Sequence, residues 1–166
     1  MHLKSIFPSS PNKPLELDDL LNDAALRRIE EAIRQAERGT SGEIRVHVDE
    51  ICQDDPLDHA AYLFSELGMH RTALRNGVLI YLSWADHKLA IIGDAGIHAA
   101  TGESFWQSTR DTMLAHFREE RFVEGIIAGV QMAGQQLQVH FPIQPGDANE
   151  LTNTVSRGAA KSRRKP

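Results

Sequence analysis

The run Val78-Leu79-Ile80-Tyr81-Leu82 limits the folds open to this chain more than any other segment. It follows Asn76-Gly77, a dipeptide typical of turns. A strand with one wet face alternates apolar and polar side chains, whereas a strand covered on both faces is apolar throughout. The run therefore predicts a central strand of a sheet that carries helices.

Two further segments have strand patterns. Residues 43–49 alternate strictly, with Ile44, Val46 and Val48 on one face and polar side chains on the other. This pattern predicts a strand with one wet face near the edge of the sheet. Residues 88–93 follow the central run after a short turn, and we expect them to form its hairpin partner.

Helical spacing of apolar residues accounts for the rest of the body. We expect helices from about residue 19 or 22 to 38, and over about 56–68, 103–119 and 122–140. The second helix connects the first two strands, and a right-handed crossover makes them parallel. The order α-β-α-β-β-α-α predicts the α/β class, as an α/β/α sandwich with a small mixed central sheet.

Charge is distributed unevenly along the chain. The 166 residues include 18 basic and 23 acidic ones, a net charge of −5. Residues 157–166 hold five basic residues and no acid, which leaves 13 basic against 23 acidic residues, a net charge of −10, for residues 1–156. This balance argues against specific nucleic-acid binding through the whole surface. The basic tail offers a contact for an acidic surface.

Composition also suggests how the chain is organised. The segments 1–17 and 143–166 predict a flexible N-terminal arm and a polar tail ending in the basic cluster, around a domain over 18–142. Cys52 is the only cysteine, which excludes an internal disulfide and a four-cysteine zinc site. We find neither a secretory signal nor an apolar run long enough to span a membrane, so we expect a soluble, cytoplasmic protein.

The predicted topology brings three turns together at one edge of the sheet. This edge, the first rim, comprises residues 40–43, 76–77 and 93–96. Carboxylates bind hard cations such as calcium or magnesium, and glycines let backbone amides approach an anion. The candidate metal ligands at the first rim are Glu43 and Asp94. The candidate phosphate-binding residues are Ser41, Arg75, Asn76, Gly93 and Gly96.

The opposite edge of the sheet is a rival metal site. This second rim collects the end of the first strand and the hairpin turn, and its candidate ligands are Asp49, Asp54, Asp55 and Asp86. The carboxyl ends of parallel strands, where open α/β sheets usually bind ligands, favour this rim. Each of these acids also has a structural interpretation as a helix cap or a solvated loop residue.

Four short motifs occur in an order that resembles the TPM-domain family. They are Thr40–Ile44, Arg75–Ile80, Ile91–Ile97 and Asp147–Leu151. The resemblance covers about residues 20–151 and implies an α/β/α sandwich with a mixed sheet. It also implies a choice of functions, because the thylakoid member is described as an acid phosphatase, some members bind calcium or magnesium, and others are accessory factors without clear catalysis. Ser41, Glu43, Asn76 and Asp94 fall within these motifs, which favours the first rim.

Two functions follow from these observations. The first is a non-catalytic interaction module that binds calcium or magnesium, needs no organic cofactor and holds a protein partner of unknown identity. The alternative is a metal-assisted, acid-phosphatase-like hydrolase of phosphate esters. The catalytic residues of such a hydrolase are unknown from the sequence, and whether the protein is an enzyme stays open.

Overall fold

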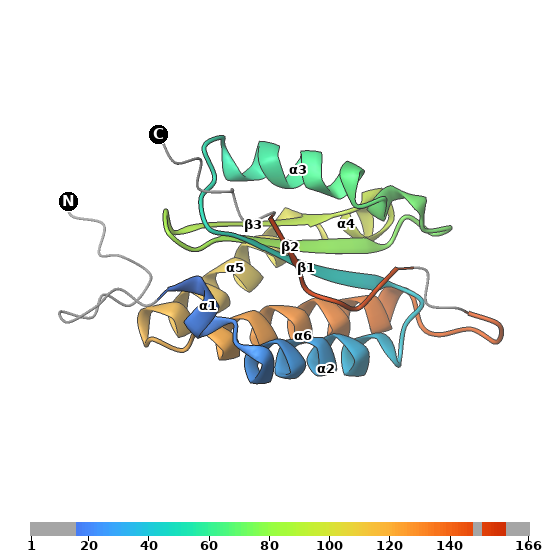
Figure 1. Ribbon diagram of the computed structural model, residues 1–166. Helices are drawn as coiled ribbons and strands as arrows, with labels where there is room; N and C mark the ends of the chain where they lie inside the picture. Colours follow the sequence, from blue (N-terminus) through green and yellow to red (C-terminus); the bar gives the residue numbers. More distant parts are fainter. Residues whose placement is uncertain (1–15, 148–150, 159–166) are drawn as a thin grey trace.

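The centre of the molecule is a four-stranded mixed sheet. The computed structural model describes residues 16–147 and 151–158. Within them the strand order is β3-β2-β1-β4 (Figure 1). The strands are β1 (Glu43–Asp49), β2 (Gly77–Ser83), β3 (Lys88–Gly93) and β4 (Ser156–Arg157). β1 runs parallel to β2 and β4, and β3 runs antiparallel to β2, so the predicted crossover and hairpin are confirmed.

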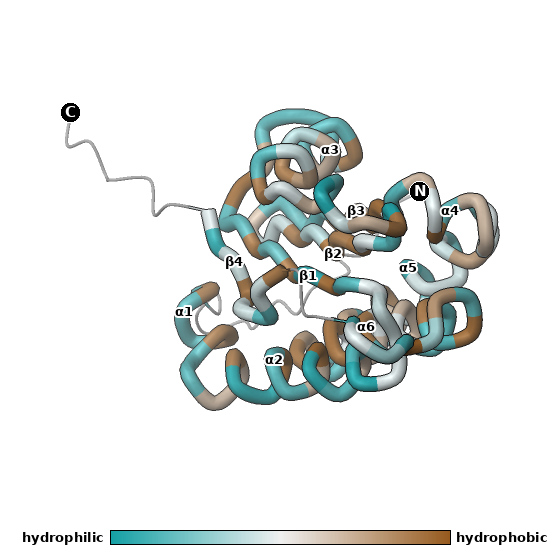
Figure 2. The backbone as a smooth tube through the Cα atoms, turned by 90° about the vertical axis from the view of Figure 1, so that its right-hand side faces the viewer, coloured by the Kyte–Doolittle hydropathy of each residue, from teal (hydrophilic) through white to brown (hydrophobic). Residues whose placement is uncertain are grey.

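Helices cover both faces of this sheet. In chain order they are α1 (Leu17–Leu20), α2 (Asp23–Glu37), α3 (Pro56–Glu66), η1 (Met69–Arg71), α4 (Ala95–Thr101), α5 (Glu103–Arg118) and α6 (Phe122–His140). Figure 2 shows α3 above the strands and α2 and α6 below them. The α/β sandwich expected from the sequence is therefore confirmed. Within the described residues, every helix is too short or too polar to cross a membrane.

Alternation along the strands divides the core into two layers. In β2, Val78, Ile80 and Leu82 pack into the larger cluster with α2, α5 and α6. Leu79 and Tyr81 point the other way, into the cluster with α3 and η1. Each of these five side chains is fully buried, as the continuous apolar run predicts.

The wet face predicted for β1 is wrong. Glu43 and His47 lie on that face and are only 2% and 4% exposed. Their face is the one that α3 covers, because Tyr81 pairs with His47 in register and points into the layer beneath α3. β4 also flanks β1, so β1 is an inner strand at this position. Polar residues on a strand do not prove a wet face when hydrogen bonds satisfy them.

Short elements extend the predicted order. α1 begins at Leu17, which is 9% exposed, within the segment predicted as an arm. β4 lies within the predicted tail, where Val155 is 7% exposed and joins the larger core cluster. The extent of the domain, 18–142, stays a prediction. Most of the predicted arm and basic cluster, residues 1–15 and 159–166, lies outside the described residues.

Candidate functional site

The three turns of the first rim lie together. The Glu43 amide donates to the Asn76 carbonyl at 3.4 Å, which joins the first turn to the second. The Gly96 amide donates to the Arg75 carbonyl at 2.8 Å, which joins the third turn to the second. The parallel register of β1 with β2 and the antiparallel return of β3 produce this convergence.

Asp94 is occupied by protein partners at this rim. The Arg75 guanidinium donates to both carboxylate oxygens, at 2.7 and 2.9 Å, and the Ala95 amide donates at 2.7 Å to cap α4. Burial opposes ionisation, but the hydrogen bonds from Arg75 and Ala95 outweigh it and lower the pKa of Asp94. Asp94 is therefore an ionised cap paired with a cation, and its charge is already compensated.

The two glycines beside Asp94 serve close packing. A Cβ on Gly96 would lie 2.4 Å from the Leu74 carbonyl oxygen, and a Cβ on Gly93 would lie 2.4 Å from Trp106 Cζ2. Any side chain at either position would push the neighbouring turn or ring away. The Gly96 amide, predicted to face a phosphate, instead bonds the Arg75 carbonyl.

A cavity of about 260 Å³ lies beside the Arg75–Asp94 pair. Its lining residues come from α3, η1, the turn before β2, β3 and the cap of α4. They are Ala61, Phe64, Ser65, His70, Arg75, Ile92 and Asp94. Arg75 and Asp94 line part of the cavity, and their two formal charges cancel. Phe64 and Ile92 add apolar surface to the lining. The cavity thus lacks the excess negative charge that attracts a divalent cation.

Glu43 faces a second carboxyl that the sequence did not single out. Glu37, the last residue of α2, shares a hydrogen bond with Glu43 and also accepts from the Ile44 amide at 2.8 Å. Burial, with the nearby Glu43 carboxyl, raises the pKa of Glu37 to about 8, against the smaller effect of the Ile44 amide. At neutral pH the pair therefore holds a proton between two acids.

This carboxyl pair lines a second cavity, of about 220 Å³. Figure 1 shows its setting, where the end of α2 turns into β1. Its described lining residues are Arg34, Glu37, Arg38, Thr40, Ser41, Gly42, Glu43, Ile143, Asp147 and Asn153. Thr40 fixes the turn, because its hydroxyl donates to the Phe141 carbonyl at 2.5 Å, lies 3.0 Å from the Leu137 carbonyl and accepts from the Gly42 amide. The predicted Ser41 and Glu43 thus line the same cavity, while Arg75 and Asp94 line the other.

Asn76 contacts Ser41, a lining residue of this second cavity, and has one polar atom unsatisfied among the described residues. Its side-chain amide donates to the Ser41 hydroxyl at 3.2 Å, and the residue is 1% exposed. Its Oδ1 atom is buried and has no hydrogen-bond partner among the described residues. A buried amide oxygen without a donor is unfavourable by about 1–3 kcal/mol, so it marks a place where a bound group would be stabilised.

One signal in the sequence could have pointed to Glu37. A helix ends with a partial negative charge, so an acid in its last turn is disfavoured unless something compensates it. Glu37 ends α2 beside the Gly39 turn, directly before β1. Its contact with Glu43 depends on how closely α2 approaches the start of β1, which no periodicity reveals.

The acids of the second rim have separate structural roles. Asp55 caps α3 by accepting from the Leu57 amide at 2.9 Å. Asp86 accepts from the Cys52 amide at 3.0 Å and lies 3.5 Å from the Lys88 ammonium.

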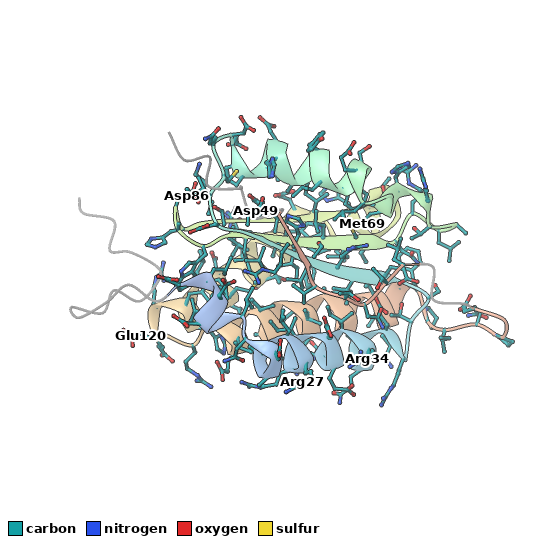
Figure 3. The ribbon with its side chains drawn as sticks, in the orientation of Figure 1. Arg27, Arg34, Asp49, Met69, Asp86 and Glu120 are labelled. Carbon is teal, nitrogen blue, oxygen red and sulfur yellow. The ribbon has the colours of Figure 1, made fainter. Side chains whose placement is uncertain are left out.

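Asp54 is exposed, and its backbone carbonyl, rather than its carboxylate, accepts from Lys88. Asp49, labelled in Figure 3, accepts from two histidines and a tyrosine. Among the described residues, no group of three or more His, Cys, Asp or Glu side chains is placed to hold a metal ion.

Comparison with known proteins identifies the family. The model of the TPM domain matches residues 16–136, most of the chain. The chain belongs to the TPM-domain family, as its motifs predict. No curated protein matches the chain.

Solved structures share the same fold. The BA42 protein from the psychrophilic bacterium Bizionia argentinensis has a TM-score of 0.80 and 38% identity, over 86% of this chain and 99% of its own. An N-terminal domain from P. gingivalis has a TM-score of 0.62 and 22% identity, over 75% of this chain and 81% of its own. The N-terminal domain of cg2496 from Corynebacterium glutamicum has a TM-score of 0.59 and 12% identity, over 81% and 88%. The last two similarities show a shared fold and nothing more.

Proposed function

We propose that this TPM-domain protein binds calcium or magnesium at the Glu37–Glu43 pair and uses the loaded site to hold a protein partner without catalysis. The carboxyl pair is the observation that carries the proposal. Two acids held together against their mutual repulsion need a positive charge between them, and in its absence a proton takes that place. A divalent cation supplies more charge than the proton and prefers carboxylate oxygens.

Two neighbouring groups support the assignment. Among the described residues the buried Oδ1 of Asn76 has no donor, and the side-chain amide of the same residue bonds Ser41, which lines this cavity. Amide and hydroxyl oxygens complete the shells of hard cations, together with backbone carbonyls and water. The proposed ligands are thus Glu37, Glu43 and Asn76, with Ser41 beside them, and Asp94 is left to its ion pair.

The partner is a protein that presents an acidic group. The Arg34 and Arg38 side chains line the same cavity, so a loaded cation and two guanidiniums would together face an incoming carboxylate or phosphate. The basic cluster after residue 156 is the second proposed contact with such an acidic surface.

Amide NMR during titration with calcium and with magnesium tests the cation site. We expect saturable shifts over residues 37–44 and at Asn76, and their loss in Glu37→Gln and Glu43→Gln. Asp54→Asn is the matched control, because it removes an exposed acid from the second rim. Shifts confined to residues 49–55 and 83–88, or no saturable shifts, would contradict the proposal.

A phosphatase-like activity is the second candidate, favoured by the two arginines beside the carboxyl pair. In that case the cation would polarise a phosphoryl oxygen and lower the pKa of a bound water, while Arg34 and Arg38 hold phosphate oxygens. We expect release of phosphate from p-nitrophenyl phosphate that stops with chelator and in Glu43→Gln. Turnover that neither change affects would exclude this site as its source.

A further inference from the structure

A chain of three side chains joins β4 to β1 at the second rim. The Ser156 hydroxyl oxygen lies 2.8 Å from His47 Nδ1, and His47 Nε2 lies 2.9 Å from an Asp49 carboxylate oxygen. Ser156 and His47 are direct neighbours in the parallel register of the two strands. The chain therefore contains a hydroxyl, an imidazole and a carboxylate, each within hydrogen-bond distance of the next.

The partners of the imidazole fix the direction of these hydrogen bonds. An ionised carboxylate only accepts, so the proton on a neutral His47 ring lies on Nε2. Nδ1 then carries the lone pair, and the Ser156 hydroxyl donates to it. The other acceptor near this hydroxyl, the Val46 carbonyl, is more distant, at 3.4 Å. A lone pair toward the hydroxyl and a proton toward the carboxylate are what a histidine base requires, with the two ring nitrogens exchanged relative to the usual Ser-His-Asp triad.

Asp49 is held in place on its second oxygen. His59 Nε2 lies 3.1 Å from that oxygen, and the Tyr81 hydroxyl donates to it at 3.0 Å. Burial disfavours the charge, but the hydrogen bonds from His47, Tyr81 and His59 outweigh it and lower the pKa of Asp49. The carboxylate is thus a fixed negative charge that orients the imidazole, and the side chains of His47 and Asp49 are only 6% and 12% exposed.

Ser156 has a more open position than its partners. It is half-buried on β4, which is an edge strand of the sheet. The Gly158 amide donates to the Val48 carbonyl of β1 at 3.3 Å. Amides alternate in direction along a strand, so the Arg157 amide faces away from β1. A donor on the residue after the serine is thus available for a developing oxyanion at the open edge.

We infer that Ser156 is a nucleophile, with His47 as its general base and Asp49 as the positioning residue, for small acyl esters and phosphonate esters that reach the edge of β4. The Ser156 oxygen bonds to the acyl carbon, and its proton passes to His47. The ester bond then breaks, and the alcohol leaves with that proton. Water then attacks the acyl carbon and gives one proton to His47. The bond between that carbon and the Ser156 oxygen breaks, His47 returns the proton to the serine oxygen, and the acid leaves. This activity is independent of the cation site.

A fluorophosphonate probe tests the inference on the full-length protein. The serine oxygen displaces fluoride from phosphorus and forms a stable adduct, so one labelled site is expected, and peptide mass spectrometry should map it to Ser156. Ser156→Ala should abolish labelling, whereas Ser104→Ala, which changes an exposed serine of α5, should leave it unchanged. Asp49→Asn should lower the labelling rate on the order of a hundredfold or more, because the amide disturbs the imidazole tautomer.

Circular dichroism shows whether each variant is folded, and the label on the wild-type protein does not depend on any variant. Hydrolysis of p-nitrophenyl acetate that Ser156→Ala removes would extend the result to acyl esters. The inference is overturned if the wild-type protein takes up no label, if the label maps to another residue, or if folded Asp49→Asn reacts as fast as wild type.

Discussion

The two rims of the sheet satisfy their buried acids in opposite ways. At the first rim, Glu37 and Glu43 face each other, and a proton offsets their repulsion. At the second rim, the single Asp49 carboxylate receives donors on both oxygens from His47, His59 and Tyr81. A carboxylate surrounded by donors needs no further ligand, whereas a pair of acids gains from any cation that replaces the shared proton. The proposed cation site therefore lies at the first rim, although the second rim holds more acids.

The largest effect on stability should follow from removing the Asp49 carboxylate from the second rim. Asp49→Ala leaves three side-chain donors without their acceptor, two of them on the buried His47 and Tyr81. We expect the free energy of unfolding to fall by about 3 kcal/mol, measured by urea denaturation. Asp54→Ala, at an exposed position of the same rim, should change it by less than about 0.5 kcal/mol. Equal effects of the two changes would mean that the Asp49 network contributes nothing.

Cation binding at the first rim should stabilise the folded protein, and the gain should grow with the cation concentration relative to the dissociation constant. A cation at a hundred times its dissociation constant raises the free energy of unfolding by about 2.7 kcal/mol. We expect thermal denaturation to show this increase with calcium or magnesium and to lose it in Glu43→Gln. If Glu43→Gln keeps the full increase while Asp49→Asn loses it, the assignment of the two rims is reversed.

The shared proton predicts how stability depends on pH. Burial and Glu43 raise the pKa of Glu37 in the folded protein to about 8, from 4.5, so the folded state keeps a proton that the unfolded chain releases. This contribution is fully present below about pH 4.5 and is lost as pH rises through about 8. We expect it to amount to on the order of 4 kcal/mol between about pH 5 and pH 9.

Glu37→Gln should remove that pH dependence. Glutamine keeps the acceptor for the Ile44 amide and replaces the shared proton with a fixed N–H donor to Glu43. Chemical denaturation at pH 5, 7 and 9 measures the difference between the two proteins. A wild-type curve that runs parallel to the Glu37→Gln curve would show that the carboxyls do not share a proton.

The smallest effect should come from the surface contact of β4. The Arg157 guanidinium lies 2.7 Å from the Asp18 carboxylate, and the two side chains are 36% and 82% exposed. Exposed ion pairs contribute little because water and salt screen them. Arg157→Ala should lower the free energy of unfolding by about 0.5 kcal/mol or less, measured by urea denaturation. A larger loss would mean that the ion pair, and not the Ser156–His47 hydrogen bond, holds β4 on the sheet.

Much of the sheet could be predicted from the sequence because its signals are local. The apolar run in β2 and the hairpin to β3 follow directly from residue patterns, and the crossover rule supplies the parallel pairing with β1. Those three strands place the turns of the first rim, so their convergence was also predictable. β4 was not, because a strand of two residues has no period.

The contacts within each rim depend on tertiary packing and could not be predicted. Asp94 was a reasonable cation ligand by residue type, but the Arg75 guanidinium donates to both of its carboxylate oxygens. Glu37 precedes Glu43 by only six residues, but their carboxyl groups come into contact only because α2 ends against the start of β1. The alternation of residues 43–49 predicted that His47 faces solvent, whereas α3 and β4 cover it in the structure.

The hydrogen bond between His47 and Ser156 joins residues 109 positions apart. Closing a loop of that length is entropically unfavourable, and contacts so distant in sequence form after local ones such as the β2–β3 hairpin. β4 should therefore dock late in folding and be among the first elements to open, with weakly protected amides in hydrogen exchange. A serine that becomes reactive only after this docking would report that a newly made chain has finished folding.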